Sequence, residues 1–531
     1  MVVAGLYLAT AGHVGSKNVF FAGDAGPYPV SVVVRPPDVV PGLAEISVRV
    51  PGGAGDVERV TVRPVRWDAA PEGGAPPPDM AQLVPGDPEL HGAEVWLMTV
   101  GAYRIEVTVS GSRGTGTASV PVTSVMLAVR DLPPALGAAL LLLALLLVAG
   151  AVSIAGAAVR ESRLGPEQTV RGTHRRRGWI AMAGAAALLM AAAWFGNAWW
   201  DAVDRDVRGG IFRPLAVDAA VTHGADGSVL AIRITDPSWL GRNWSPLVPD
   251  HGKLMHMFVI GAPGMEAFAH LHPVPVDTAT FRARWPDLPP GEYRIYGDIV
   301  HESGFAQTLV DTVWVDAAEH GDAGSGPAPE PDADDSRWQG TPSPVSGPGA
   351  STSLSDGSVM EWLAAPELRV DEEVVLSFAV RDPAGDPAVL EPYMGMTGHA
   401  ALTRDDGSVF VHLHPAGTIS MGSLAVLAPE TRLVTESGAA NAAESVGGVR
   451  EVPGDSHGRP PRLRRRRGGR VPVRVPSTGR LHHLGAGEAG RQCAYRRVPG
   501  EGGRVGSDGT TVEIDGDDRK AMFISVQRAG K

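Results

Sequence analysis

The feature that most restricts how this chain can fold is a run of 25 residues, Ala135 to Val159, that contains no charged side chain. About 20 apolar residues are enough to cross a bilayer, where a helix satisfies the hydrogen bonds of its own backbone. A second apolar run covers residues 178–200 and ends in Trp194-Phe195 and Trp199-Trp200, a typical interfacial aromatic anchor. The sequence therefore predicts transmembrane helices over residues 135–159 and 178–200.

The segment between these helices, residues 160–177, carries six arginines. Basic residues concentrate in the cytoplasmic loops of membrane proteins. We therefore expect a membrane protein, with the lipid bilayer as a partner, loop 160–177 in the cytoplasm and both flanking regions outside. The alternative is a pair of buried helices in a soluble protein.

The chain also contains an internal duplication. The runs Phe268-Ala-His-Leu-His-Pro273 and Phe410-Val-His-Leu-His-Pro415 are nearly identical. The segments before them correspond in order and spacing, Leu230–Pro237 with Leu376–Pro383 and His251–His256 with Met394–His399. Such matched order indicates a repeated module.

Composition and alternation predict a mainly β protein. Gly (67) and Pro (45) make up about a fifth of the 531 residues, and short stretches alternate apolar with polar residues between turn clusters. We expect three β-sandwich modules, a two-helix transmembrane hairpin and a disordered C-terminal tail. The expected segments outside the hairpin are 1–12 (a signal-peptide remnant or an ordinary apolar start), 28–123 (first β module), 211–316 (second), 317–352 (flexible linker), 353–434 (third, incomplete) and 435–531 (tail).

The tail differs in character from the modules before it, since Pro460–Arg470 has no strand or helix pattern. Read one nucleotide later, codons for Val471–Pro499 could encode the sequence Tyr-Thr-Ile-Trp-Val-Gln-Val-Lys. That sequence matches the closing strands Tyr103-Arg-Ile105 and Tyr293-Arg-Ile295 of the other modules. We therefore expect a frameshift between about 435 and 470, which the DNA sequence would test.

Each copy of the duplication contains a candidate metal site. Side chains two residues apart share one face of a strand, about 7 Å apart along it, and each His-Leu-His has a further histidine upstream. Three imidazoles in this arrangement favour a metal ion, and thioethers favour Cu(I). The expected ligands are His256, His270 and His272, with Met255 and His301 as additional donors, and in the second copy His399, His412 and His414, with Met396.

Copper is the metal we expect, with zinc as the alternative, because Met394-Gly-Met396 precedes His399. The competing interpretation is that these histidines are structural, hydrogen-bonded on the face of a sandwich. Repetition does not decide between them, because duplication copies structural residues as well.

Other functional classes have little support. The net charge of −12 gives no argument for a nucleic-acid partner, and a single cysteine, Cys493, permits no internal disulfide. The chain contains no nucleophile–histidine–acid signature, no phosphate-binding glycine loop and no His-Glu-x-x-His motif. We expect a binding protein rather than an enzyme.

These motifs resemble those of poorly characterised bacterial membrane proteins with extracytoplasmic immunoglobulin-like domains. Residues Pro27–Val30 through Gly101–Val107 are similar to YtkA-like or FixH-like domains, and His251–His256, His-Leu-His-Pro and His301-Glu-Ser-Gly-Phe305 resemble His/Met repeats. Copper carriers of the CopC type are a looser analogy. The resemblance implies a protein anchored in the bacterial inner (plasma) membrane, with its β domains on the extracytoplasmic side. Its expected role is copper binding or delivery, and the alternative is a structural protein that binds another envelope protein.

Overall fold

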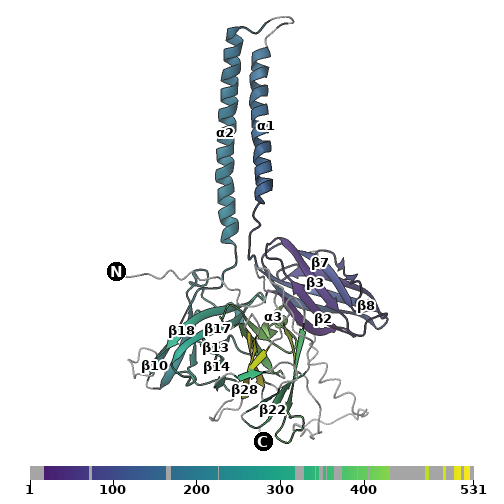
Figure 1. The fold of residues 1–531 in the computed structure, drawn as a ribbon, viewed down its shortest axis with the longest axis vertical. Coiled ribbons are helices and arrows are strands. Elements are labelled where there is room, and N and C mark those ends of the chain that lie inside the picture. Colours follow the sequence, from purple (N-terminus) through teal and green to yellow (C-terminus); the bar gives the residue numbers. More distant parts are fainter. Residues whose placement is uncertain are drawn as a thin grey trace. The chain divides into compact units, whose positions relative to one another are not determined.

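The computed structural model describes residues 17–70, 74–162, 165, 169–224, 226–316, 328–340, 343–345, 351–354, 356–363, 374–390, 393–396, 398–404 and 406–430, and four strands beyond them. The chain divides into two compact units (Figure 1). One is Val125–Arg213, which contains the two long helices, and the other consists of the residues on both sides of it. The expected signal-peptide remnant, residues 1–12, lies outside the described residues.

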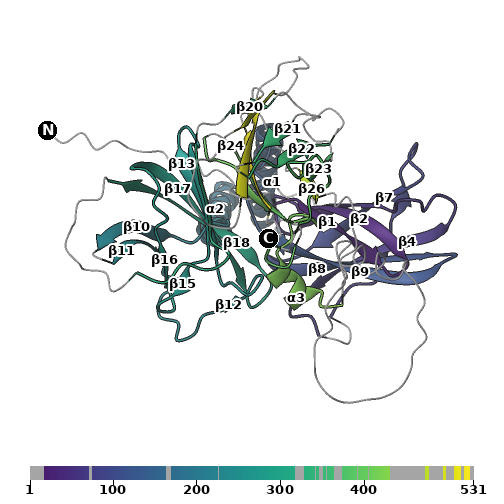
Figure 2. The same ribbon diagram turned by 90° about the horizontal axis from the view of Figure 1, so that it is seen from below.

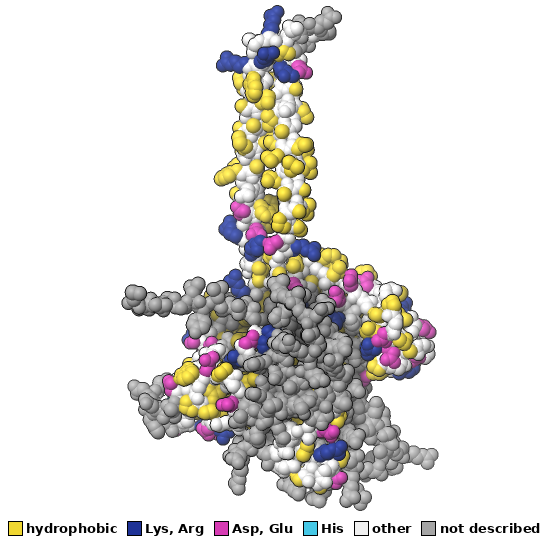
Figure 3. Space-filling view, in the orientation of Figure 1, with side chains coloured by type: hydrophobic (Ala, Val, Ile, Leu, Met, Phe, Trp, Pro, Cys, Tyr) yellow, Lys and Arg dark blue, Asp and Glu magenta, His cyan; other side chains and the backbone are white. Residues whose placement is uncertain are grey.

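The two apolar runs form the long helices α1 (Pro134–Glu161) and α2 (Gly172–Gly209). Both are long and apolar enough to cross a membrane, and 0% and 6% of their most apolar windows are buried. A core helix of a soluble protein would be mostly buried. Figure 3 shows apolar side chains along the hairpin and Lys and Arg side chains gathered at its loop end.

Two glycines let the helices approach each other near that loop. Gly156 and Gly178 are the buried residues of α1 and α2. A Cβ atom on Gly178 would lie 3.1 Å from the carbonyl oxygen of Gly156, closer than a side chain normally packs. The second helix begins at Gly172, so the end of the expected basic loop 160–177 is already helical.

The first module is a sandwich of two antiparallel sheets, as the alternation predicts. Its strands bury alternate residues, for example Ala44, Ile46 and Val48 of β3. It begins before the expected boundary of residue 28, because β1 pairs with β2 along its whole length. One sheet contains β1 (Val19–Ala25), β2 (Tyr28–Arg35), β3 (Gly42–Arg49), β7 (Leu90–Leu97) and β6 (Gln82–Leu83), and the other contains β5 (Asp79–Met80), β4 (Val57–Arg66), β8 (Gly101–Gly111) and β9 (Gly114–Ser124).

The second module also has two sheets, which appear as separate layers in Figure 2. The apolar residues of both sheets form one buried core between them. One sheet contains β10 (Val217–Gly224), β11 (Gly227–Ile234), β16 (Thr280–Arg284) and β15 (Val274–Pro275), and the other contains β12 (Leu247–Val248), β17 (Gly291–His301), β13 (His256–Ala262), β14 (Ala267–Leu271), β19 (Ser336–Gln339) and, beside β17, β18 (Ala306–Val315).

Strand β19 corrects the expected linker. Its composition suggested that 317–352 is a flexible connection, but residues 336–339 extend the second module by pairing with β14. The acidic turn before this strand binds residues of the candidate metal site. Tertiary pairing overrides the polar composition here because the edge of β14 offers unpaired backbone groups.

The third module repeats the hairpin that contains the His-Leu-His-Pro motif. Strand β24 pairs with β25 as β13 pairs with β14, and it pairs on its other side with β29, as β13 does with β17. Its sheets contain β21 (Ser351–Ser353), β22 (Val359–Trp362), β23 (Val374–Arg381) and β26 (Val473–Ser477), and β20 (Ser343–Val345), β27 (Ala494–Arg497), β28 (Asp508–Asp515), β29 (Lys520–Val526), β24 (His399–Arg404) and β25 (Phe410–Leu413), with the short helix α3 (Met421–Leu427).

Beyond residue 430 the structure describes only the backbone of strands β26 to β29. The expected disorder of residues 435–531 otherwise concerns residues outside the described part of the chain. The pairing of β29 with β24 fills the position that the sequence predicts to be vacant in an incomplete third module.

Candidate metal centre

The histidines lie on the faces of two hairpins that pack against each other. Phe258 and Phe268 of the second module and Ala401 and Phe410 of the third share one buried apolar cluster. Alternation within each strand places the histidines on that same shared face. The sheet of β13 and β14 is therefore buried on both sides, by its own module and by the third module.

The first three expected ligands converge. One ring nitrogen from each of His256, His270 and His272 lies within 4.8 Å of the others, and all three side chains are buried. Two ligands at about 2.1 Å from one ion are at most about 4.2 Å apart, so a small inward shift of the rings would bring them to bonding distance. The face of Phe258 stacks on His270 at 4.4 Å and limits how that ring can turn.

Hydrogen bonds assign the protons of His256 and His270. The Nε2 of His256 lies 3.0 Å from the carbonyl oxygen of Asp250 and must donate to it, which leaves Nδ1 bare. The hydroxyl of Tyr393 donates to the carbonyl of Asp334 at 2.7 Å, so the Nδ1 of His270 donates to that hydroxyl at 3.0 Å. The bare nitrogens, His256 Nδ1 and His270 Nε2, then face each other at 3.2 Å. Two lone pairs at this distance repel unless a proton or a metal ion lies between them.

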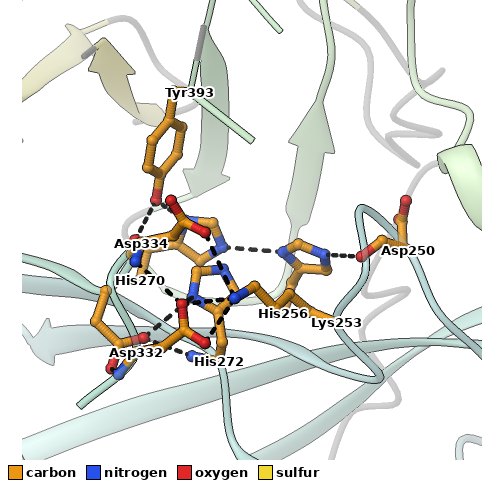
Figure 4. A network of polar contacts seen from close by, with 9 residues as sticks. Asp250, Lys253, His256, His270, His272, Asp332, Asp334 and Tyr393 are labelled. Atoms are coloured by element: carbon orange, nitrogen blue, oxygen red, sulfur yellow. Dashed lines mark hydrogen bonds and ion pairs between the residues drawn. The ribbon is translucent and has the colours of Figure 1, made fainter. Parts of the chain in front are cut away.

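The third ring is oriented by a carboxylate of the acidic turn. Figure 4 shows His272 together with Lys253 and with Asp332 and Asp334 of this turn. The Nδ1 of His272 donates to Oδ1 of Asp335 at 3.0 Å, and its Nε2 is buried without a hydrogen-bond partner among the described residues. The same turn binds Lys253, whose Nζ lies 2.6 Å from both carboxylate oxygens of Asp332. Carboxylate–histidine pairs of this kind orient metal ligands.

A second triad has a different composition from the one that the sequence predicts. One nitrogen from each of His251, His399 and His414 lies within 4.8 Å of the others. His251 comes from the second module, in the turn before β13. His251 is part of the repeated motif His251–His256, but it is not among the ligands that the sequence predicts. The position of His251 in the repeated turn is the sequence feature that could have identified it as a ligand.

That turn has the same geometry in both modules. Asp250 and Lys253 exchange two backbone hydrogen bonds, and Tyr393 and Met396 do the same. The residue after the first of each pair is left-handed, with φ 49° at His251 and φ 53° at Met394. His251 therefore corresponds to Met394, and Asp250 corresponds to Tyr393. Each turn reaches a histidine of the other module, because Tyr393 binds His270 and His251 lies 5.1 Å from His399, ring centre to ring centre.

His412, an expected ligand, lies between the two triads without belonging to either. Its ring centre is 4.4 Å from that of His414 and 5.7 Å from that of His256. Its Nδ1 lies 3.3 Å from Oδ2 of Asp298, while its Nε2 has no hydrogen-bond partner in the described part of the chain. His412 can therefore supply a further nitrogen to either group.

The centre favours neutral imidazoles. Burial lowers the pKa of His256 to about 3, and it also lowers the pKa of His270, His399 and His414 well below the usual value. Neighbouring imidazoles lower these pKa values further, because two adjacent protonated rings would repel each other. Neutral imidazole is the form that binds a metal ion.

The other expected donors lie elsewhere. Met255 is on the opposite side of its strand from His256 and packs in the core of the second module, while Met396 is in the core cluster of the first. His301 lies beside Gln307 and the ring of Trp239, and burial lowers its pKa to about 4. Alternation already excludes Met255, since neighbouring residues of a strand face opposite ways.

Comparison with known proteins gives a match for one module. Residues 352–441 match the family model of a domain of unknown function, DUF8832. The match covers the part of the third module that contains β22 to β25 and α3, and it ends within the stretch where the sequence predicts a frameshift, which stays a prediction. It does not include the first module, whose resemblance to YtkA-like or FixH-like domains also stays a prediction. No curated protein matches the chain.

Two solved structures align with the chain at low similarity. The adhesin FdeC of Escherichia coli is 11% identical, with 73% of this chain and 79% of that chain covered and a TM-score of 0.13. A protein of Corynebacterium diphtheriae described as membrane anchored is 10% identical, with 73% and 71% covered and a TM-score of 0.13. Similarity at this level supports no transfer of function.

Proposed function

We propose that this protein is a membrane-anchored, extracytoplasmic metal-binding protein, and that His256, His270 and His272 bind the ion. The observation that carries the proposal is the convergence of three buried rings, each of which donates a hydrogen bond from one nitrogen to oxygen. The other nitrogen of each ring thus keeps a lone pair available for an ion. The ion is bound rather than chemically transformed.

Structural histidines would be arranged differently. Buried polar atoms in folded proteins nearly always have a hydrogen-bond partner. In this cluster His272 Nε2, His412 Nε2 and both nitrogens of His399 lack one within the described residues. Leaving a buried polar group unpaired costs about 1–3 kcal/mol. An ion bound by the first triad would pair His272 Nε2, whereas a purely structural role would leave this nitrogen unpaired.

Copper is the proposed ion, with zinc as the alternative. Imidazole nitrogens suit both metals, so the thioether must decide. Met396 packs in an apolar core and is not available as a ligand. The remaining methionine of this motif is Met394, which occupies the same position in its turn as the proposed ligand His251 does in the other module. A thioether at this position would favour Cu(I).

The proposed location follows from the helical hairpin. Its two exposed apolar helices would span the bacterial inner membrane, with the arginine-rich loop in the cytoplasm. The β modules before and after the hairpin would then lie outside the cytoplasm, where they could receive or deliver an ion.

Metal titration of the full-length chain in detergent tests the proposal. After treatment with a chelator, the protein is titrated with Cu(I) without oxygen, with Cu(II) and with Zn(II), and bound metal is measured by elemental analysis. We expect tight binding that decreases by at least one equivalent when His270→Gln and His272→Gln are combined. His301→Gln is the matched control, because His301 is a half-buried histidine of the same module and lies outside the triads.

A folded wild-type chain that binds no ion more tightly than an exposed histidine would overturn the proposal. The role of the histidines would then be structural, and the competing function, binding of another envelope protein, would become the stronger one. A spectroscopic readout does not depend on whether the variants fold. Bound Cu(II) in the wild-type chain should show magnetic coupling to imidazole nitrogen.

A further inference from the structure

We infer that His251, His399 and His414 bind a second metal ion beside the first, so that two β modules share one two-ion centre. This inference rests on the proposed function, because it assigns the same class of ion to a neighbouring set of imidazoles. It differs from the sequence prediction of one separate site per module. Neither module contains the complete second triad.

The second triad has the chemistry of a ligand set. Both ring nitrogens of His399 and both of His414 are buried without a hydrogen-bond partner among the residues described. The Nε2 of His251 is also buried without a hydrogen-bond partner among these residues. The ring of His251 forms a hydrogen bond with the backbone of Met394. Five buried nitrogens without a partner are costly in a metal-free protein, and one ion would bind three of them.

The position of His251 is fixed by contacts that join the modules. The carboxylate of the preceding residue, Asp250, accepts hydrogen bonds from the backbone N–H groups of Met421 and Gly422 at 2.9 and 3.2 Å. Its carbonyl accepts the ring N–H of His256. Asp250 thereby links the first triad, the turn that contains His251 and helix α3 of the third module. His251 therefore lies in a turn of the second module that is hydrogen-bonded to the third module, and its ring lies beside the histidines of the third module.

The two triads are close enough for their ions to interact. The ring centres of His251 and His256 are 6.0 Å apart, and those of His270 and His399 are 6.5 Å apart. His412 lies between the triads with one bare nitrogen and a carboxylate on the other. Such an arrangement places two ions next to each other with an imidazole available to either.

The test is the number of ions bound by the full-length chain with and without His251. Asn is the replacement of choice, because it tolerates the left-handed backbone at φ 49° and removes the imidazole. With Cu(II) and with Zn(II), we expect two tightly bound ions in the wild-type chain and one in His251→Asn. His301→Gln serves again as the control and should keep both.

Electron paramagnetic resonance distinguishes neighbouring from distant ions. Two adjacent Cu(II) ions in the wild-type chain should give a broadened signal of reduced intensity. His251→Asn should give the sharp signal of one isolated ion. The wild-type stoichiometry is informative even if the variant does not fold.

The outcomes separate this inference from the proposed function. One ion in the wild-type chain, lost with His270→Gln and His272→Gln but kept in His251→Asn, would overturn the second site and leave the first. Two ions in both the wild-type chain and His251→Asn would also overturn it, because the second ion would lie elsewhere. No bound ion would overturn both.

Discussion

At the scale of single residues, the candidate centre depends on groups that the sequence analysis did not select. The first triad is held by the Asp250 carbonyl, the Tyr393 hydroxyl and the Asp335 carboxylate, each on a ring nitrogen that faces away from the other rings. Asp335 comes from the stretch assigned to a flexible linker, and Tyr393 from the other module. Neither has a sequence spacing to the histidines that would reveal its role.

Asp335→Asn should weaken binding of the first ion by about 10–100-fold, the usual effect of losing an outer partner of a ligating histidine, and leave the number of bound ions unchanged. The reason is that the ring N–H of His272 would donate to a neutral amide instead of a carboxylate. Competition titration against a chelator of known affinity measures the change.

Asp334→Asn is the matched control for that experiment. Its carboxylate lies 3.4 Å from Lys253, and its contact with Tyr393 uses the backbone carbonyl, which the substitution keeps. Equal losses of affinity in the two variants would argue against a specific role for Asp335.

At the scale of elements, the two-residue repeat of the strands and the length of the apolar runs carry most of the information. The two-residue repeat of β14 puts His270 on the shared face and Ala269 and Leu271 in the core of the second module, as the sequence predicts. The same rule sends Met255 away from His256. The apolar runs form helices that extend beyond both predicted ends, because helix formation is cooperative and continues into flanking residues such as Gly172–Arg177.

The orientation of the hairpin can be tested with single cysteines. In a Cys493→Ser background, a membrane-impermeant thiol reagent should label Glu292→Cys in intact spheroplasts and should label Thr169→Cys only after permeabilisation. Both positions are exposed, Thr169 between the helices and Glu292 on β17 of the second module.

Labelling of both cysteines in intact cells would contradict two membrane crossings, and the reversed pattern would contradict the orientation. Labelling of both in denatured samples controls for the presence and reactivity of each introduced thiol.

At the scale of the whole molecule, the His/Met modules form one buried centre rather than two separate sites. Contacts across the boundary include the Tyr296 hydroxyl donating to the carbonyl of Gly407 and the Ser423 hydroxyl donating to that of Gly304. The third module also contacts the first, since the N–H of Ala22 donates to the carbonyl of Ala416. These contacts bury imidazoles that a single module would expose.

This burial predicts that the metal-free protein is less stable in acid. The folded chain keeps its rings neutral, whereas the unfolded chain protonates them below about pH 6.5, so the unfolded state binds more protons. As the pH decreases below this value, the free energy of unfolding should therefore decrease by up to about 1.4 kcal/mol per pH unit for each ring. Within the candidate centre, the rings whose pKa is lowered by burial are His251, His256, His270, His399, His412 and His414.

One carboxylate acts in the opposite direction. Burial raises the pKa of Asp298 to about 6, so the folded chain takes up this proton first and gains stability as pH falls from about 6 toward the unfolded pKa of about 4. The several histidines outweigh it. Denaturant unfolding of the metal-free chain between about pH 8 and pH 5.5 measures the sum. A midpoint that rises or stays constant on acidification would contradict the burial of neutral rings.

The sequence by itself determined the elements of local origin. Apolar run length is sufficient for the helices, and strand alternation is sufficient for the β modules and for the shared face of His270 and His272, since both depend on neighbours along the chain. The tertiary structure decided which nitrogens meet. His251 joins His399 and His414, while His412 turns to Asp298, because a strand pattern gives the side of a sheet but not the partner that packs against it. Ligand sets that cross a module boundary depend on that packing, and no spacing within one repeat encodes it.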